Sequence, residues 1–126
     1  MSDTARKTVL IVDDTEDIAD LVATVLRMAD FNTVTARDGM EAVSAAVEHK
    51  PDLILMDIRM PVMDGYEASR LILAIPELSA TPIIAVSAHC GGDWAQKARD
   101  AGCVHCVLKP IDPHSLQTMV EDFIGR

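Results

Sequence analysis

Residues 53–67 read LILMDIRMPVMDGYE, and this stretch decides the fold. Four apolar residues run directly into Asp57, which predicts that a strand from the protein interior ends on a carboxylate. Burying a carboxylate is costly unless a positive charge or hydrogen-bond donors meet it. The stretch therefore predicts that other charged side chains lie beside Asp57.

Five apolar runs alternate with amphipathic segments along the chain. The runs predict strands that begin near Thr8 (TVLIV), Phe31 (FNTVTA), Asp52 (DLILM), Pro82 (PIIAVSA) and Val104 (VHCVLK). The segments between them predict helices over residues 17–28, 39–47, 66–75 and 94–101. A last helix is expected after Asp112 as N-cap, with Pro113 at its first position. This alternation predicts an α/β fold with one parallel sheet and helices on both faces.

The apolar side chains of these helices recur at helical spacing, which predicts the faces that pack on the sheet. The expected inward residues are Ile18, Leu21, Val22, Val25 and Leu26, then Met40, Val43, Ala46 and Val47, then Ala68, Leu71, Ile72 and Ile75, and finally Leu116, Met119, Val120 and Phe123. The run near Phe31 contains Asn32 and two threonines, which suits a strand at the edge of the sheet.

The 126-residue chain has the length of one domain, which we expect to span residues 1–126. Hydrophobic residues make up 49% of it, but no apolar run approaches the ~20 residues of a membrane span. The start of the chain lacks a signal-peptide pattern, so we expect a cytoplasmic protein without membrane contact. The net charge of −9 disfavours direct binding to nucleic acid. Three cysteines in such a chain predict reduced thiols rather than disulfides.

Polar side chains stand where the predicted strands end. The first strand ends in Asp13 and Asp14, the third in Asp57, the fourth in Ser87 and the fifth in Lys109. Because the carboxyl ends of parallel strands form one rim, where such sheets place their sites, these groups should converge. Mg²⁺ is a cation that takes carboxylate and phosphate oxygens, and a carboxylate can accept a phosphoryl group. Lys109 and Ser87 would then stabilise the transferred group.

Each of these residues also has a simpler interpretation. Asp13 and Asp14 could cap the next helix, and Lys109 could be a solvated surface lysine. The conjunction of such groups at four strand ends favours a site.

At these residues the sequence resembles the receiver domain of two-component response regulators. The resemblance runs through VLIVDD, DLILMDIRMPVMDGYE, TPIIAVSA and AGCVHCVLKP, nearly the whole chain, and the chain is similar to stand-alone, chemotaxis-regulator-like receivers. It implies a doubly wound, flavodoxin-like (βα)5 sheet in the order 2-1-3-4-5. It also implies a signalling protein that catalyses only its own phosphorylation and dephosphorylation.

The resemblance assigns roles to individual residues. Asp57 would be the phosphoacceptor, and its donor would be a histidine kinase or a histidine phosphotransfer protein. Mg²⁺ would be bound by Asp14, Asp57 and the backbone carbonyl of Arg59, with Asp13 reaching it through water. Ser87 would follow the phosphoryl group and Lys109 would pair with it, and the Lys109–Pro110 bond would be cis. Phosphorylation would switch binding to a downstream protein.

The turn after the acceptor and the region before Lys109 complete these expectations. Pro61 is expected to fix the loop beside Asp57, and Asp64 and Gly65 to form a turn that caps the third helix. Receivers usually carry an aromatic residue three positions before the lysine, where this chain has Cys106. Because cysteine is too small to fill the space that the Ser87 hydroxyl would vacate, we expect the switch in loop 87–94. There Gly91 and Gly92 permit movement, and Trp94 would move with them.

Three other functions are alternatives for this pattern of residues. Cys103 and Cys106 form a C-x-x-C pattern that could bind a metal or act in redox chemistry, with Cys90 and His89 elsewhere. An aspartyl-phosphate phosphatase would need a second aspartate where Arg59 stands. A flavodoxin would need a phosphate-binding loop after the first strand, where DDTEDI is acidic. The chain stops soon after the fifth predicted helix, so we expect no output domain.

Overall fold

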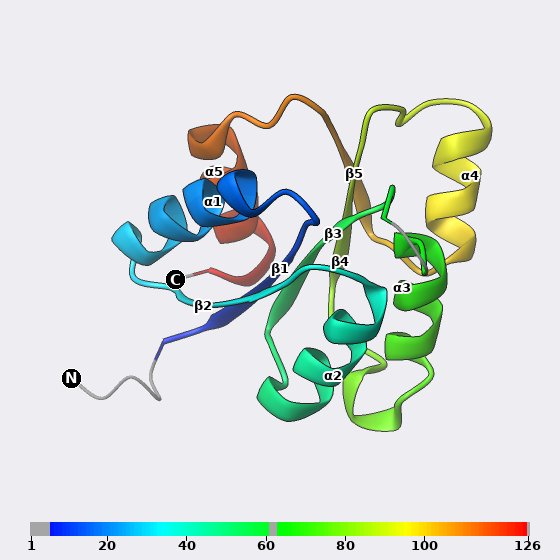
Figure 1. The fold of residues 1–126 in the computed structure, drawn as a ribbon, viewed down its shortest axis with the longest axis horizontal. Coiled ribbons are helices and arrows are strands. Elements are labelled where there is room, and N and C mark those ends of the chain that lie inside the picture. Colours follow the sequence, from blue (N-terminus) through cyan, green and yellow to red (C-terminus); the bar gives the residue numbers. More distant parts are fainter. Residues whose placement is uncertain (1–5, 61–62, 126) are drawn as a thin grey trace.

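The computed structural model describes residues 6–60 and 63–125, and Pro61 lies outside them. Strands and helices alternate throughout this part of the chain (Figure 1). In order, the elements are β1 (Thr8–Val12), α1 (Glu16–Met28), β2 (Asn32–Ala36), α2 (Gly39–His49), β3 (Leu53–Asp57), α3 (Gly65–Leu73), the 3₁₀ turn η2 (Pro76–Leu78), β4 (Ile83–Ser87), α4 (Asp93–Asp100), β5 (His105–Leu108) and α5 (Pro113–Ile124). The predicted elements are confirmed, with ends that differ by one or two residues.

The five strands form one parallel sheet in the order β2-β1-β3-β4-β5, as the resemblance implies. The central strand β3 is buried along its whole length, which matches its continuous apolar sequence. The more polar β2 lies at one edge, as expected, and β5 lies at the other. Asp57 therefore ends the middle strand, with the ends of β1 and β4 on its two sides.

Two layers of helices cover the sheet (Figure 1). On one face α1 and α5 lie side by side and enclose a core that includes Ile11, Leu55 and Ile84. On the other face α2, α3 and α4 enclose a second core that includes Leu10, Ile54 and Ile83. Successive residues of each inner strand point to opposite faces, so the same strand supplies both cores.

Several helix residues expected to be buried are instead exposed. In α1 the stripe that packs on the sheet consists of Ala19, Val22, Ala23 and Leu26, at positions i, i+3, i+4 and i+7. Ile18 and Leu21 lie outside this stripe, so their side chains face solvent. The prediction was wrong for six residues, namely Ile18, Leu21, Met40, Val47, Leu71 and Phe123.

The start of α3 packs tightly against the end of β3. Asp64 caps the helix, because its Oδ1 accepts a hydrogen bond from the Glu67 amide at 2.9 Å, as predicted. The Gly65 amide donates to the Ile58 carbonyl at 2.9 Å. A Cβ at Gly65 would lie 2.8 Å from the Ile58 Cα and would overlap the Asp57 carbonyl oxygen. Glycine at this position therefore allows the helix to meet the backbone that carries Asp57.

Replacing Gly65 by alanine should destabilise the fold by roughly 1–3 kcal/mol, the usual cost of overpacking a close contact. The measurement is urea unfolding followed by circular dichroism. Gly91→Ala is the control, because a Cβ there meets nothing within 4 Å. Equal stability of Gly65→Ala and wild type would contradict the close approach.

Candidate functional site

Asp57 is a buried carboxylate at the carboxyl end of the sheet. Only 1% of its surface is exposed. It is paired in register with Val86, so Ser87 at the end of β4 comes one residue later along the neighbouring strand. The central strand thus presents its acid between groups from both neighbouring strands.

Lys109 forms an ion pair with Asp57. Its Nζ lies 3.0 Å from the Asp57 Oδ1, although the two residues are 52 positions apart in the sequence. The lysine follows β5, and its amide donates to the Ser87 carbonyl at 2.8 Å, which fixes the backbone beside β4. Its bond to Pro110 is cis, as the resemblance implies. The lysine side chain is 36% exposed, so the ion pair lies between the buried acid and the solvent.

Three carboxylates gather at this rim. One oxygen each of Asp13, Asp14 and Asp57 can be chosen so that all three atoms lie within 4.8 Å of one another. Among residues 6–60 and 63–125 this is the only such group of acids, histidines or cysteines. The N-cap of α1 is Thr15, and Asp13 instead accepts a hydrogen bond from the Thr15 amide at 2.8 Å. Neither aspartate therefore stands at the cap position, which removes the simpler interpretation of the acidic pair.

One oxygen of Asp57 has no hydrogen-bond partner among residues 6–60 and 63–125. Its Oδ1 accepts from Lys109 and from the Arg59 amide at 3.2 Å. Its Oδ2 is buried and forms no hydrogen bond within the described part of the chain. A buried acceptor without a partner is costly, and native proteins usually keep one for a function. A hard cation held by oxygen ligands fits this set, because its charge would reduce the repulsion between the three acids.

The protein environment raises the pKa of Asp57 above its ordinary value. Burial is the largest cause, and the negative charge of Asp13 acts in the same direction. The ammonium group of Lys109 and the Arg59 amide oppose the rise without cancelling it. Asp57 is thus an acid whose charge the protein only partly compensates.

Ser87 and the loop after it form the next part of the site. Ser87 is buried, and its Oγ accepts a hydrogen bond from the His89 amide at 3.1 Å. The His89 ring stacks on Trp94 with centroids 5.1 Å apart, and Lys97 Nζ lies 5.1 Å from the centre of the Trp94 ring. Trp94 also lines a hollow of about 530 Å³ together with Asp14 and Arg59. The only tryptophan of the chain therefore borders the acidic site.

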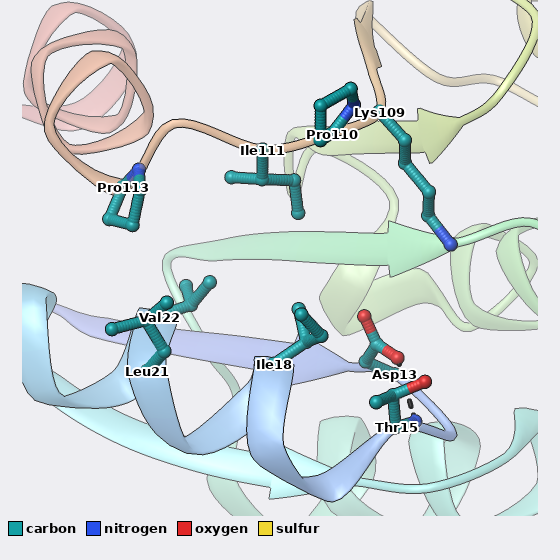
Figure 2. A pocket seen from close by; sticks show the side chains of 9 residues that line it. All are labelled: Asp13, Thr15, Ile18, Leu21, Val22, Lys109, Pro110, Ile111 and Pro113. Atoms are coloured by element: carbon teal, nitrogen blue, oxygen red, sulfur yellow. Dashed lines mark hydrogen bonds between the residues drawn. The ribbon is translucent and has the colours of Figure 1, made fainter.

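A second hollow of about 410 Å³ opens on the other side of the rim (Figure 2). Ile18, Leu21 and Val22 of α1 form one wall, and Ile111 and Pro113 from the segment before α5 form the opposite wall. Asp13 and Lys109 stand at one end of it, where the lysine side chain points toward the side of the hollow that carries Asp13. Ile18 and Leu21, wrongly predicted as core, thus form an exposed apolar surface in the hollow that Asp13 and Lys109 border.

The cysteines differ from the prediction. Cys90 and Cys106 are joined in a disulfide, whereas the sequence predicted reduced thiols. Cys103 is free and buried, with its Sγ 3.7 Å from the Ser69 Oγ. The C-x-x-C interpretation is therefore wrong in its pairing, because Cys103 faces α3 while Cys106 is bonded to the loop after β4. The expected adjacency of the fourth and fifth strands was the sequence signal that could have suggested this pair.

The parallel sheet with its acidic rim defines a class of signalling domain, and comparison with known proteins identifies the class. The family model described as the response regulator receiver domain matches residues 9–121. The chain belongs to this family, and it is a signalling rather than an enzymatic protein. Membership implies phosphoacceptor signalling with a histidine kinase as the partner. The flavodoxin and phosphatase alternatives do not agree with this match.

Individual relatives and solved structures agree with the family. The chain is 35% identical over 120 residues to the polar-differentiation response regulator DivK of Brucella anthropi, covering 94% of this chain and 97% of the relative. The chemotaxis protein CheY4 of Vibrio cholerae superposes with a TM-score of 0.90 at 29% identity, covering 94% and 98%. The receiver domain of the sensor histidine kinase PA1611 of Pseudomonas aeruginosa, which has a magnesium ion in its active-site cleft, superposes at 0.86 with 31% identity, covering 96% and 99%.

Across the described residues, none of the helices is both long and apolar enough to cross a membrane.

Replacing Asp57 by asparagine should stabilise the folded protein at neutral pH without Mg²⁺, by roughly 1–3 kcal/mol. An acid with a raised folded-state pKa binds protons more tightly when folded, so wild-type stability falls as pH rises from the ordinary value of 3.8 through the raised value. The advantage of Asp57→Asn should therefore grow through that window and vanish below it.

Thermal unfolding at a series of pH values measures this effect. Asp122→Asn, at an exposed position of α5, is the control for removing one negative charge. An Asp57→Asn variant less stable than wild type at pH 7 would contradict the argument.

Proposed function

We propose that Asp57 accepts a phosphoryl group from a histidine kinase or a histidine phosphotransfer protein, with Mg²⁺ as cofactor, and that phosphorylation switches binding to a downstream protein. The observation that carries this proposal is that Asp57, beside two further carboxylates and an ammonium group, has a buried Oδ2 that forms no hydrogen bond among the described residues. A purely structural ion pair would have no need of the two extra acids, which repel Asp57.

Mg²⁺ would be held by Asp14, by Asp57 and by the backbone carbonyl of Arg59, with Asp13 acting through water. The cation supplies positive charge at the transferred phosphoryl oxygens. The mutual approach of the three acids to within 4.8 Å supports this ligand set. The magnesium ion in the cleft of the PA1611 receiver supports the choice of metal.

Asp57 is the nucleophile of the transfer. Lys109 and the Arg59 amide both bind Oδ1, which leaves the lone pairs of Oδ2 free to attack phosphorus. A new O–P bond forms as the P–N bond to the donor imidazole breaks, and the imidazole leaves with the bonding electron pair. Lys109 then pairs with a phosphoryl oxygen, and the Ser87 hydroxyl donates to another, so both residues stabilise the charge of the product.

The donor protein would approach over the apolar hollow beside the rim (Figure 2). Its histidine must reach Asp57 from the carboxyl edge of the sheet, and the surface next to that edge carries Ile18 and Leu21, which are 39% and 50% exposed. Covering them would remove apolar area from water. We place this exchange in the cytoplasm, where kinases obtain their phosphoryl groups from ATP.

The switch would operate through loop 87–94. The Ser87 hydroxyl accepts a hydrogen bond from the His89 amide, and its movement toward the phosphoryl group would break that bond. The loop contains Gly91 and Gly92, and Gly92 has a φ of 58°, which glycine adopts at little cost. Because His89 stacks on Trp94, movement of the loop would be transmitted to the start of α4.

Incubation with Mg²⁺ and a small acyl phosphate donor should add one phosphoryl group to the wild-type protein and none to Asp57→Asn. The bond should be labile to base and to hydroxylamine, as expected of an acyl phosphate. Intact-protein mass spectrometry measures the addition, and Asp122→Asn should be labelled like wild type. Equal labelling of Asp57→Asn would overturn the assignment of the acceptor.

A further inference from the structure

The disulfide between Cys90 and Cys106 joins two segments that the proposed switch uses. Cys90 comes three residues after Ser87, and Cys106 comes three residues before Lys109. Cys106 is paired in register with Ala85 on β4, so the loop that follows β4 turns back over β5 to bring Cys90 to it. Their Cα atoms are 5.8 Å apart, within the usual range for bonded cysteines. The bond therefore ties the loop between Ser87 and Trp94 to the strand that leads to Lys109.

Both cysteines border a hollow that a small reagent can enter. Cys90 and Cys106 are half-buried and line an open hollow of about 300 Å³ at the edge of the sheet. Arg99 lines the same hollow, and a guanidinium group near a cysteine favours the thiolate form that reacts. Cys103 also borders this hollow, but it is only 7% exposed and contacts Ser69, so it is the least accessible of the three.

A disulfide is unusual in a protein that works, as we propose, in the cytoplasm. Reducing systems keep most cytosolic thiols reduced, and the disulfides that do form there are usually transient and catalytic or redox-sensing. β5 is an edge strand, so the disulfide from Cys106 to Cys90 lies at the margin of the sheet and does not cross either hydrophobic core. Opening it would leave both cores intact while releasing one attachment of the loop.

We propose that Cys90 and Cys106 form a reversible redox site that reacts with small-molecule disulfides and limits the response of loop 87–94 to phosphorylation. One cysteine thiolate attacks a sulfur of the small disulfide and expels one small thiolate. The second cysteine thiolate attacks the mixed disulfide and expels the other. The two cysteines are oxidised, the small disulfide is reduced to two thiols, and the two cysteine protons pass to these products.

The consequence for signalling rests on the proposed function. With the bond closed, the loop is attached at Cys90, which follows Ser87 and His89 in the chain and precedes Trp94 at the start of α4. A phosphoryl group can then shift the loop only as far as this attachment allows. With the bond open, the loop is free to follow Ser87, so the reduced protein is the responsive form.

Equilibration with oxidised or reduced glutathione, followed by acid quenching and alkylation under denaturing conditions, tests the redox site. Intact-protein mass should show one alkylated cysteine in the oxidised protein and three in the reduced protein, out of the three in the chain. Peptide mapping should place the disulfide between residues 90 and 106. Cys90→Ser and Cys106→Ser should each abolish the closed form, and Cys103→Ala should retain it. Three alkylated cysteines after oxidation, or a bond that includes Cys103, would overturn the redox site.

Trp94 emission on addition of Mg²⁺ and beryllofluoride, a phosphoryl mimic, tests the coupling. The shift in the oxidised protein should be about half of that in the reduced protein or smaller. Cys90→Ser should give the reduced response under both conditions. Equal shifts in verified oxidised and reduced protein would overturn the coupling. A reduced protein that shows no shift would contradict the proposed switch, whereas the glutathione-dependent thiol count would still support the redox site.

Discussion

The buried charge of Asp57 is the constraint on which the site depends. A carboxylate that ends the central strand of a parallel sheet loses most of its hydration. The ion pair with Lys109 offsets only part of that lost hydration energy, so the pKa of Asp57 stays raised. The sheet order places the ends of β1 and β4 on either side of it, which brings in Asp13 and Ser87. Among the described residues, the fold thus leaves one oxygen of this acid without a hydrogen-bond partner, and a cation or a phosphoryl group at the site would add to the charge that Lys109 provides or use that oxygen.

The sequence was sufficient to predict the fold and most of the site because both depend on regular patterns. Alternating apolar runs and helical periodicities define a parallel α/β sheet, and in such a sheet all strands end at the same edge. The sequence therefore predicts that Asp14, Asp57 and Lys109 lie close together, although they are far apart in the chain. The partnerless Oδ2 of Asp57 was not predictable, since it depends on which atoms Lys109 and the Arg59 amide reach.

The errors arose where tertiary packing overrides a local pattern. Ile18 and Leu21 have the spacing of core residues, but the buried stripe of α1 runs through Ala19 to Leu26 without them, which leaves both exposed next to the acidic rim. The cysteine count predicted free thiols, whereas the loop after β4 returns over β5 and joins Cys90 to Cys106. Both departures lie near the site, and both concern surfaces that a partner or a small reagent can reach.

The most direct test of the central claim is the stability gained from Mg²⁺ by wild type and by Asp57→Asn, measured by thermal unfolding with Asp122→Asn as the charge-matched control. A ligand at about 100 times its dissociation constant stabilises the folded state by about 2.7 kcal/mol. If the site is built to hold a cation at the buried acid, wild type and Asp122→Asn should gain stability of this order, and Asp57→Asn should gain much less. Equal gains in all three proteins would show that Mg²⁺ only screens the net charge of −9, and would contradict the account.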